Sequence, residues 1–163
     1  MHRLLRLFIK KNTGFTLIEV LIAMLVLAVG LLGLAGFQVF SLRNNQSAYN
    51  RSQATQLAYD MADKIRANPS EANNLASSTY VLTSAAILQT SCNSSPGCTP
   101  ALMAQNDRAL WNTNIISALG SFGAGSITVD PATKVFTITI NWDDDRDGDA
   151  DANDPNFQMS FQL

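Results

Sequence analysis

The chain is poor in histidine: its 163 residues include one, His2, close to the N-terminus. Histidine is the commonest general base near neutral pH and the usual nitrogen ligand of zinc. Its scarcity argues against most acid–base catalysis and most zinc chemistry. Asp60 and Asp107 are acidic, but nothing in the sequence brings them together or supplies a nucleophile. We therefore expect no enzymatic activity and no required cofactor.

The chain also lacks a basic surface. It contains 11 Lys and Arg against 13 Asp and Glu, a formal net charge of −2, and no basic stripe with interleaved aromatic residues. Proteins that bind nucleic acid normally carry such a stripe, so we exclude nucleic acid as a partner. A length of 163 residues allows one ordinary domain, or one long element with a small domain.

Charge is almost missing from one long stretch near the N-terminus. Between Phe15 and Phe40 the single charged residue is Glu19, and about 20 apolar residues suffice for a helix to cross a bilayer. Residues 1–14 carry four bases and no acid. The positive-inside rule therefore places residues 1–14 in the cytoplasm and the rest of the chain outside it.

The small and polar residues that precede this stretch, Asn12-Thr13-Gly14, do not fit an ordinary secretory signal. A secretory cleavage site follows the apolar region, whereas these residues come before it. Cleavage here would leave the apolar stretch on the mature protein. We therefore predict a membrane anchor that is retained.

Glu19 requires an explanation, because a charged side chain at the centre of a membrane helix costs about 2.5 to 3.5 kcal/mol on insertion scales. One explanation is that Glu19 lies a single turn inside the membrane surface and extends to the lipid headgroups. The other is that a second charged group pairs with it.

The segment Gly14-Phe15-Thr16-Leu17-Ile18-Glu19-Val20 follows a short basic leader and precedes an apolar helix. It resembles the type IV prepilin signal. The resemblance implies that a prepilin peptidase cleaves between Gly14 and Phe15 and methylates the Phe15 amine. It also implies that Glu19 meets the N-terminal amine of a neighbouring subunit. Without the leader, 7 bases face 13 acids, a net charge of −6.

A single long helix is predicted from Phe15 to Asn68, because no proline occurs before Pro69. Such a helix is roughly 80 Å long, more than a bilayer requires, so its second half must pack on a soluble domain. One apolar stripe runs along that half at three- and four-residue spacing. It comprises Ala54, Leu57, Ala58, Met61, Ala62 and Ile65.

The remaining residues predict a small head. Residues 68–78 have the composition of a polar loop, and residues 80–88 fit either a strand or a turn. A second helix is predicted over residues 100–119, ended by the glycine-rich run 120–125. Strands are predicted over residues 127–129, 135–142 and 157–163, where apolar and polar residues alternate. A sheet with one apolar face beside a helix with an apolar stripe predicts an α+β, pilin-like fold.

The chain is thus divided into a leader (residues 1–14), a membrane-spanning half of the helix (15–40), an amphipathic half (41–68) and a globular head (69–163). Ala58-Tyr59-Asp60-Met61-Ala62-Asp63-Lys64-Ile65-Arg66-Ala67-Asn68-Pro69 resembles the helix end of the minor pilins called type IV pilus modification protein PilV. A cysteine pair, Asp107 and Trp111 on a helix, a glycine-rich stretch and Trp142-Asp143-Asp144 follow in the order typical of that group. Two features depart from it: Gly120-Ser121 replaces a Pro-Gly turn, and the acidic extension is longer.

This resemblance implies a minor pilin that primes or assembles a type IV pilus and so serves twitching motility and adhesion. Its implied partners are other minor pilins, the major pilin, a tip adhesin, prepilin peptidase and the inner-membrane assembly machinery. The chain would cross the inner membrane once, with its head in the periplasm, and then enter the pilus. Two alternatives stay open: a minor pseudopilin of a type II secretion system, and a membrane-anchored, calcium-dependent binding module.

The two cysteines, Cys92 and Cys98, enclose the turn-forming residues Asn93-Ser94-Ser95-Pro96-Gly97. Outside the cytoplasm such a pair is expected to form a disulfide. Closing a loop of this size stabilises a fold by roughly 2.3 kcal/mol in the chain-entropy model. The alternative is a pair of free thiols.

Seven of the 13 acidic residues lie in the segment 143–154. Six of them stand at the spacing of a calcium-binding loop, with Gly148 at the position of the sharp turn. These six are Asp143, Asp145, Asp147, Asp149, Asp151 and Asp154. Asp154 replaces the usual glutamate, and strands instead of helices flank the loop. The segment is therefore either a calcium site or a solvated acidic connection.

Overall fold

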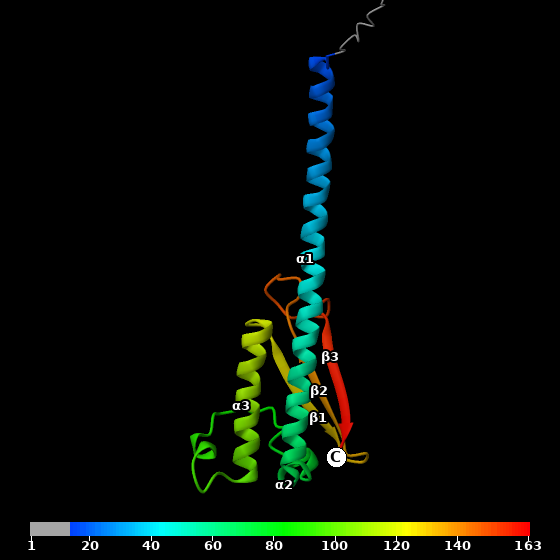
Figure 1. Ribbon diagram of the computed structural model, residues 1–163. Coiled ribbons are helices and arrows are strands. Elements are labelled where there is room, and N and C mark those ends of the chain that lie inside the picture. Colours follow the sequence, from blue (N-terminus) through cyan, green and yellow to red (C-terminus); the bar gives the residue numbers. More distant parts are fainter. Residues whose placement is uncertain (1–13) are drawn as a thin grey trace, which may run out of the picture. The chain divides into compact units, whose positions relative to one another are not determined.

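One helix of 51 residues makes up almost a third of the chain. The computed structural model describes residues 14–163, and in it α1 covers Leu17–Ala67. The helices α2 (Pro69–Ala72) and α3 (Pro100–Leu119) follow, with short 3₁₀ helices η1 (Leu75–Ser77) and η2 (Thr90–Asn93) between them. The strands β1 (Ala124–Asp130), β2 (Val135–Asn141) and β3 (Asn156–Gln162) complete the chain (Figure 1). The α+β fold predicted from the sequence is confirmed.

The chain divides into two compact units, Met1–Asn44 and Asn45–Leu163. In the described part of the first unit, α1 is exposed on all sides, and none of its most apolar 18-residue window is buried. This is the one helix among residues 14–163 that is long and apolar enough to cross a membrane. A helix that is apolar on every side requires lipid or other helices around it.

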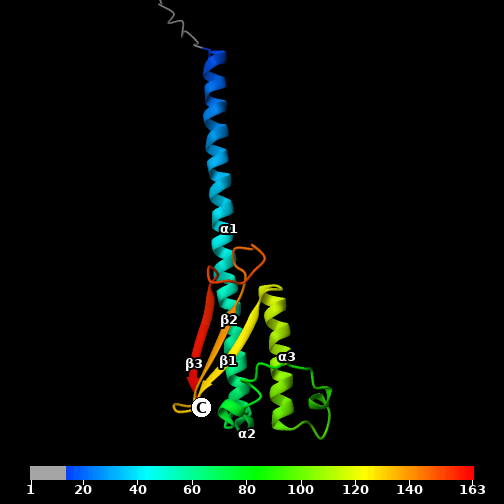
Figure 2. The same ribbon diagram turned by 180° about the vertical axis from the view of Figure 1, so that it is seen from behind.

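The second unit is a sheet packed on the end of α1. The strand order is β1-β2-β3, and both pairs are antiparallel. In Figure 1 the 45–67 part of α1 passes in front of the strands, and in Figure 2 the strands lie in front of the helix, so the sheet covers one face of α1. The helix α3 lies beside β1.

The core lies where the predicted stripe of α1 meets the central strand. Ala54, Ala58, Met61, Ala62 and Ile65 are fully buried, and so are Phe136, Ile138 and Ile140 of β2. Alternate residues of a strand face one side, and this face of β2 is the side that packs on the helix. The side chains of both elements belong to one buried cluster. The stripe predicted from the sequence is confirmed, apart from partial burial of Leu57.

The helix α3 is attached to both partners by Trp111. Its indole Nε1 donates a hydrogen bond of 2.9 Å to the Leu57 carbonyl of α1, while its ring lies against β1 at Gly125. A Cβ atom added to Gly125 would stand 2.3 Å from the Trp111 ring. Glycine is therefore required at this point of β1 because the backbone and the indole are too close for any side chain.

The connection between α1 and α3 differs from the prediction. Residues 68–78 contain α2 and η1 instead of a polar loop, and of the two alternatives left open for residues 80–88 the structure has a turn and no strand. Pro69 at the start of α2 favours a new helical turn. The buried Glu71 carboxylate accepts hydrogen bonds from the Thr79 N–H and the Asn74 amide, which folds the segment back on itself.

The buried Tyr80 hydroxyl fixes this connection to both helices. It donates a 2.9 Å hydrogen bond to Asp107 of α3 and accepts one from the Asn68 amide at the end of α1. Burial raises the pKa of Asp107 by more than the hydrogen bond from Tyr80 lowers it. Asp107 therefore serves as a structural hydrogen-bond acceptor for Tyr80.

Replacing Gly125 by alanine tests the close approach of β1 and Trp111. Because the added methyl group would overlap the indole ring, Gly125→Ala is expected to lower the free energy of unfolding by about 1 to 3 kcal/mol. Urea unfolding of the detergent-solubilised full chain, followed by tryptophan fluorescence, measures this change. Ser126→Ala, at the adjacent exposed position, is the control and should unfold like the wild type. Equal stability of both variants would contradict the packing.

Candidate functional site

The Gly14–Phe15 peptide bond precedes the first turn of α1. The described residues begin at Gly14, so residues 1–13 of the predicted leader lie outside them. Gly14, Phe15 and Thr16 belong to no helix or strand, and the Phe15 side chain is 84% exposed. No atom lies within 4 Å of a Cβ added to Gly14. The fold itself therefore does not require glycine here, and the bond is accessible to a peptidase.

Thr16 and Glu19 together form the N-terminal cap of α1. The Thr16 hydroxyl and carbonyl oxygens both accept from the Glu19 N–H, at 3.3 and 3.1 Å. The spacing Thr-x-x-Glu is that of a capping box, in which the glutamate side chain can return to the threonine N–H. In an apolar surrounding without water, such a cap satisfies backbone groups that would otherwise be unpaired.

The Glu19 carboxylate itself has no oppositely charged partner in the described chain. The salt bridges among residues 14–163 join Asp60 with Lys64 and Asp63 with Arg66, both far along α1. Glu19 is exposed, and its neighbours in the helix are apolar. A lone carboxylate in such a segment is costly unless it extends to the lipid headgroups or pairs with a charge from outside the described residues.

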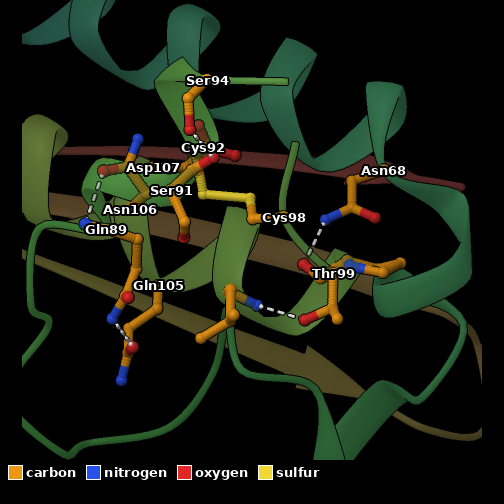
Figure 3. Close-up of a disulfide and its surroundings, with 12 residues drawn as sticks. Asn68, Gln89, Ser91, Cys92, Ser94, Cys98, Thr99, Gln105, Asn106 and Asp107 are labelled. Carbon is orange, nitrogen blue, oxygen red and sulfur yellow. Dashed lines mark hydrogen bonds between the residues drawn. A yellow bond between two sulfur atoms is a disulfide. The ribbon is translucent and has the colours of Figure 1, made fainter. Parts of the chain in front are cut away.

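The predicted disulfide between Cys92 and Cys98 is present, with Cα atoms 4.7 Å apart (Figure 3). It closes the loop that contains η2 just before α3. The same loop is held to α3 by a 2.9 Å hydrogen bond from the Gln89 N–H to Asn106, and the Thr99 hydroxyl caps the first turn of α3. The cystine therefore fixes a segment that has little regular structure of its own.

The acidic segment between β2 and β3 brings three of the six predicted ligands together. One oxygen from each of Asp143, Asp145 and Asp147 lies within 4.8 Å of the others. Asp149 and Asp151 are not part of this group. The two oxygens of Asp154 accept from the backbone N–H groups of Asp144 and Asp151, so this carboxylate closes the loop.

Repulsion between neighbouring carboxylates is visible at Asp147. The hydrogen bond that it accepts from the Asp149 N–H lowers the pKa of Asp147, but the negative charge of Asp145, desolvation, and the charges of Asp143 and Asp151 together outweigh this and raise it. Hard oxygen ligands of this kind suit calcium, and a bound cation would remove the repulsion. The donor set of Asp143, Asp145 and Asp147 therefore fits calcium.

Asp144 has a role that the sequence analysis missed. Its carboxylate accepts hydrogen bonds from the Trp142 indole at 2.9 Å and from the buried Asn50 amide of α1 at 3.2 Å. Burial on its own raises the pKa of Asp144, but these hydrogen bonds outweigh it and hold the pKa below its usual range. Nothing in the sequence distinguished it from the six other aspartates of the segment. Asp144 fixes the acidic segment to α1.

Two family models match the chain. The model described as prokaryotic N-terminal methylation motif matches residues 9–35, and the model described as type IV pilin Tt1218 matches residues 36–109. The first match contains Gly14, Phe15 and Glu19, and the second contains the cystine. No curated protein and no solved structure matches the chain. The sheet and the acidic segment lie outside both family matches.

Proposed function

We propose that this chain, which belongs to the type IV pilins, is a minor pilin that assembles and primes a type IV pilus. The family supports a subunit of a pilus or of a related pseudopilus. The family is structural, so we propose that the chain acts by assembly, without turnover of a substrate. The resemblance of Ala58–Pro69 to the PilV group supports the narrower role of a minor subunit.

One observation carries the proposal: an exposed, predominantly apolar helical segment with the single charge of Glu19 follows the accessible Gly14–Phe15 bond directly. Its large apolar side chains have no partners in the described chain. In a membrane, lipid covers them. In a filament, the corresponding helices of neighbouring subunits replace the lipid, so the same surface serves both states.

Glu19 is the residue that makes the filament more favourable than the lipid for this helix. In lipid its charge is unpaired and costly. In the proposed filament, the methylated amine of Phe15 on an adjacent subunit neutralises it, as the family resemblance implies. Removing one member of a buried ion pair costs about 3 to 5 kcal/mol, so the pair favours subunits that have joined the filament in register.

The proposal includes a location and a set of partners. The chain is anchored by residues 15–40 in the inner membrane, with its head in the periplasm, and later becomes part of the pilus. Prepilin peptidase acts on it first. The inner-membrane assembly machinery, other minor pilins, the major pilin and a tip adhesin act with it afterwards.

A minor pseudopilin of a type II secretion system is the closest rival, because it would share the N-terminal segment. Deleting the gene distinguishes the two. Loss of twitching motility and of surface pili, with normal release of exoproteins, is expected for a minor pilin. Loss of exoprotein release with normal twitching would assign the chain to secretion.

Gly14→Val tests the proposed processing. Because the fold leaves room at Gly14 for a side chain, a block in processing must come from the peptidase. The variant is expected to accumulate as a precursor that retains all 14 leader residues, while the wild type begins with N-methyl-Phe15; gel mobility and mass spectrometry of the membrane-extracted chain measure this. Gly36→Val, at another glycine with open space, should be processed normally. A mature Gly14→Val chain would refute the cleavage site.

Glu19→Ala and Glu19→Gln separate pairing of charges from helix capping. Glutamine keeps the hydrogen-bonding capacity of the cap and removes the charge. If charge pairing drives assembly, both variants still insert in the membrane. The amount of each variant in sheared pili falls by about tenfold or more, because each 1.4 kcal/mol lost is a factor of ten. Quantitative blotting of membrane and pilus fractions measures the ratio. Wild-type recovery of Glu19→Gln would reduce Glu19 to a capping residue.

A second role, calcium binding by the acidic segment, is favoured by the group formed by Asp143, Asp145 and Asp147. We propose that a bound ion stiffens the connection between β2 and β3, which Asp144 holds to α1. The alternative of another class, a calcium-dependent binding module on a membrane stalk, additionally requires that the full chain bind a receptor or glycan by itself and release it in EDTA.

Thermal unfolding tests the calcium proposal. Extracellular modules bind calcium with dissociation constants of about 0.1 to 1 mM, so about 10 mM calcium is expected to stabilise the wild type by roughly 1.4 kcal/mol or more. The melting temperature then rises by a few degrees. The double variant Asp145→Asn, Asp147→Asn should lose this rise, whereas Asp149→Asn, Asp151→Asn should keep most of it. No rise in the wild type would end the proposal.

A further inference from the structure

The two edges of the sheet are not alike. At β1, the helix α3 and the 3₁₀ helix η1 lie against the strand, and the residues of the turn at Tyr80 line a common cavity with Gly125 and Ile127. The outward backbone groups of Asn156–Gln162 make no hydrogen bond with any described residue, and the same holds for Ala124–Val129 of β1. The packing of α3 and η1 on β1 is therefore what distinguishes the two edges. Figure 2 shows β3 as the outermost strand on its side.

The β3 edge has none of the features that usually protect a free strand. Natural sheets cover such edges or interrupt them with lysine, proline, inward charges or bulges. Asn156-Phe157-Gln158-Met159-Ser160-Phe161-Gln162 contains no charge and no proline. Its seven residues pair with β2 without interruption. Every second residue of such a strand directs its N–H and C=O groups outward.

The apolar side of β3 is also incompletely covered. Ile138 and Ile140 of β2 are fully buried, but their β3 neighbours Met159 and Phe157 are only partly buried. Phe161 is covered, because the Arg66 guanidinium lies 4.5 Å above its ring. The open part of the edge therefore extends from Asn156 to Ser160. An added strand there would cover Phe157 and Met159 and satisfy the outward backbone groups.

We propose that β3 accepts an extended strand from a different pilin subunit, which continues the sheet beyond β3. This inference rests on the proposed function, because the neighbour is another subunit of the same filament. The β3 residues are uncharged, so the complementary strand alternates apolar with uncharged polar residues. Main-chain hydrogen bonds supply the attraction and the side-chain alternation supplies the register.

A second copy of this chain does not suit the edge. Antiparallel pairing of two β3 strands would reverse one head relative to the other, whereas chains inserted in one membrane share a direction. Parallel pairing of two β3 strands would turn the second head by half a revolution, so the apolar sides of the two strands would face opposite ways and Phe157 and Met159 would gain no apolar partner. If two copies point the same way and their sheets face the same side, β3 of one copy lies against β1 of the next. There α3 and η1 cover the strand. The occupant is therefore a subunit whose own edge is open.

One strand is a small interface, below the area of about 1,200 Å² that stable complexes usually bury. The membrane anchors remove this difficulty, because they confine both subunits and raise the effective concentration of one strand near the other. The contact is accordingly expected in membranes and pili and not between dilute chains in detergent.

The test places a photo-crosslinking amino acid in the full-length chain within its own cells. Gln158 and Ser160 are exposed positions on β3, and Ser126 and Thr128 occupy the same two rows on β1, across Thr139 and Thr137. We expect a crosslinked product from the β3 positions and about tenfold less from the β1 positions. Mass spectrometry should identify the partner as a different protein with a prepilin signal. Equal products from both edges, none from β3, or a product with a second copy would overturn the inference.

Two matched double variants test whether the open edge contributes to pilus assembly. Gln158→Lys, Ser160→Lys adds charge to the open edge, and Ser126→Lys, Thr128→Lys adds the same charge to the covered one. Both double variants are expected to keep the wild-type melting temperature. The amount of the first in sheared pili is expected to fall by about tenfold, equivalent to 1.4 kcal/mol. The second is expected to be recovered normally. Normal recovery of both would overturn the edge contact. Absence of the wild type from pili would refute the proposed function instead, while β3 crosslinks in the membrane would still support the strand contact.

Discussion

The constraint on which the rest of the structure depends is the apolar surface of the first part of α1, which the described chain does not cover itself. An exposed surface of this kind is stable only in lipid or against other apolar helices. The cap formed by Thr16 and the charge of Glu19 stand at the start of this surface. Anchoring and assembly are thus two solutions to one physical problem, and the chain needs no catalytic group for either.

The same helix meets a different requirement in the head. Residues 54–65 bury their apolar stripe in one cluster with the three-stranded sheet, while Trp111 joins the α1 backbone to β1. Buried polar groups fix the remaining segments: Tyr80 with Asp107, and Asp144 with Trp142 and Asn50. A small head with one short sheet has little apolar surface to bury, so these hydrogen bonds and the cystine determine how its irregular segments lie.

The sequence predicted the elements that have a clear period and failed where local hydrogen bonds decide. The stripe on α1, the helix α3, the three strands and the cystine follow from spacing and composition, and all are confirmed. The polar residues of segment 68–78 predicted a loop. The buried Glu71 carboxylate instead accepts a hydrogen bond from the Thr79 N–H, which folds the segment back on itself. The role of Asp144 was hidden for the same reason: seven similar residues do not reveal which one points at an indole. Roles that depend on an absent neighbour, such as that of Glu19, come from the resemblance and remain predictions.

The surfaces that the fold leaves open then indicate how the chain works with others. A fold in which every strand edge and every apolar side chain is covered would leave no such surface for contacts with neighbouring subunits. Here the β1 edge is covered and the β3 edge is not, so the head is asymmetric in the plane of its sheet. Contacts between unlike surfaces form a ring when the rotation between subunits closes and an open helical filament when it does not. For a subunit held parallel to its neighbours by a membrane anchor, one open edge specifies on which side the next subunit is placed.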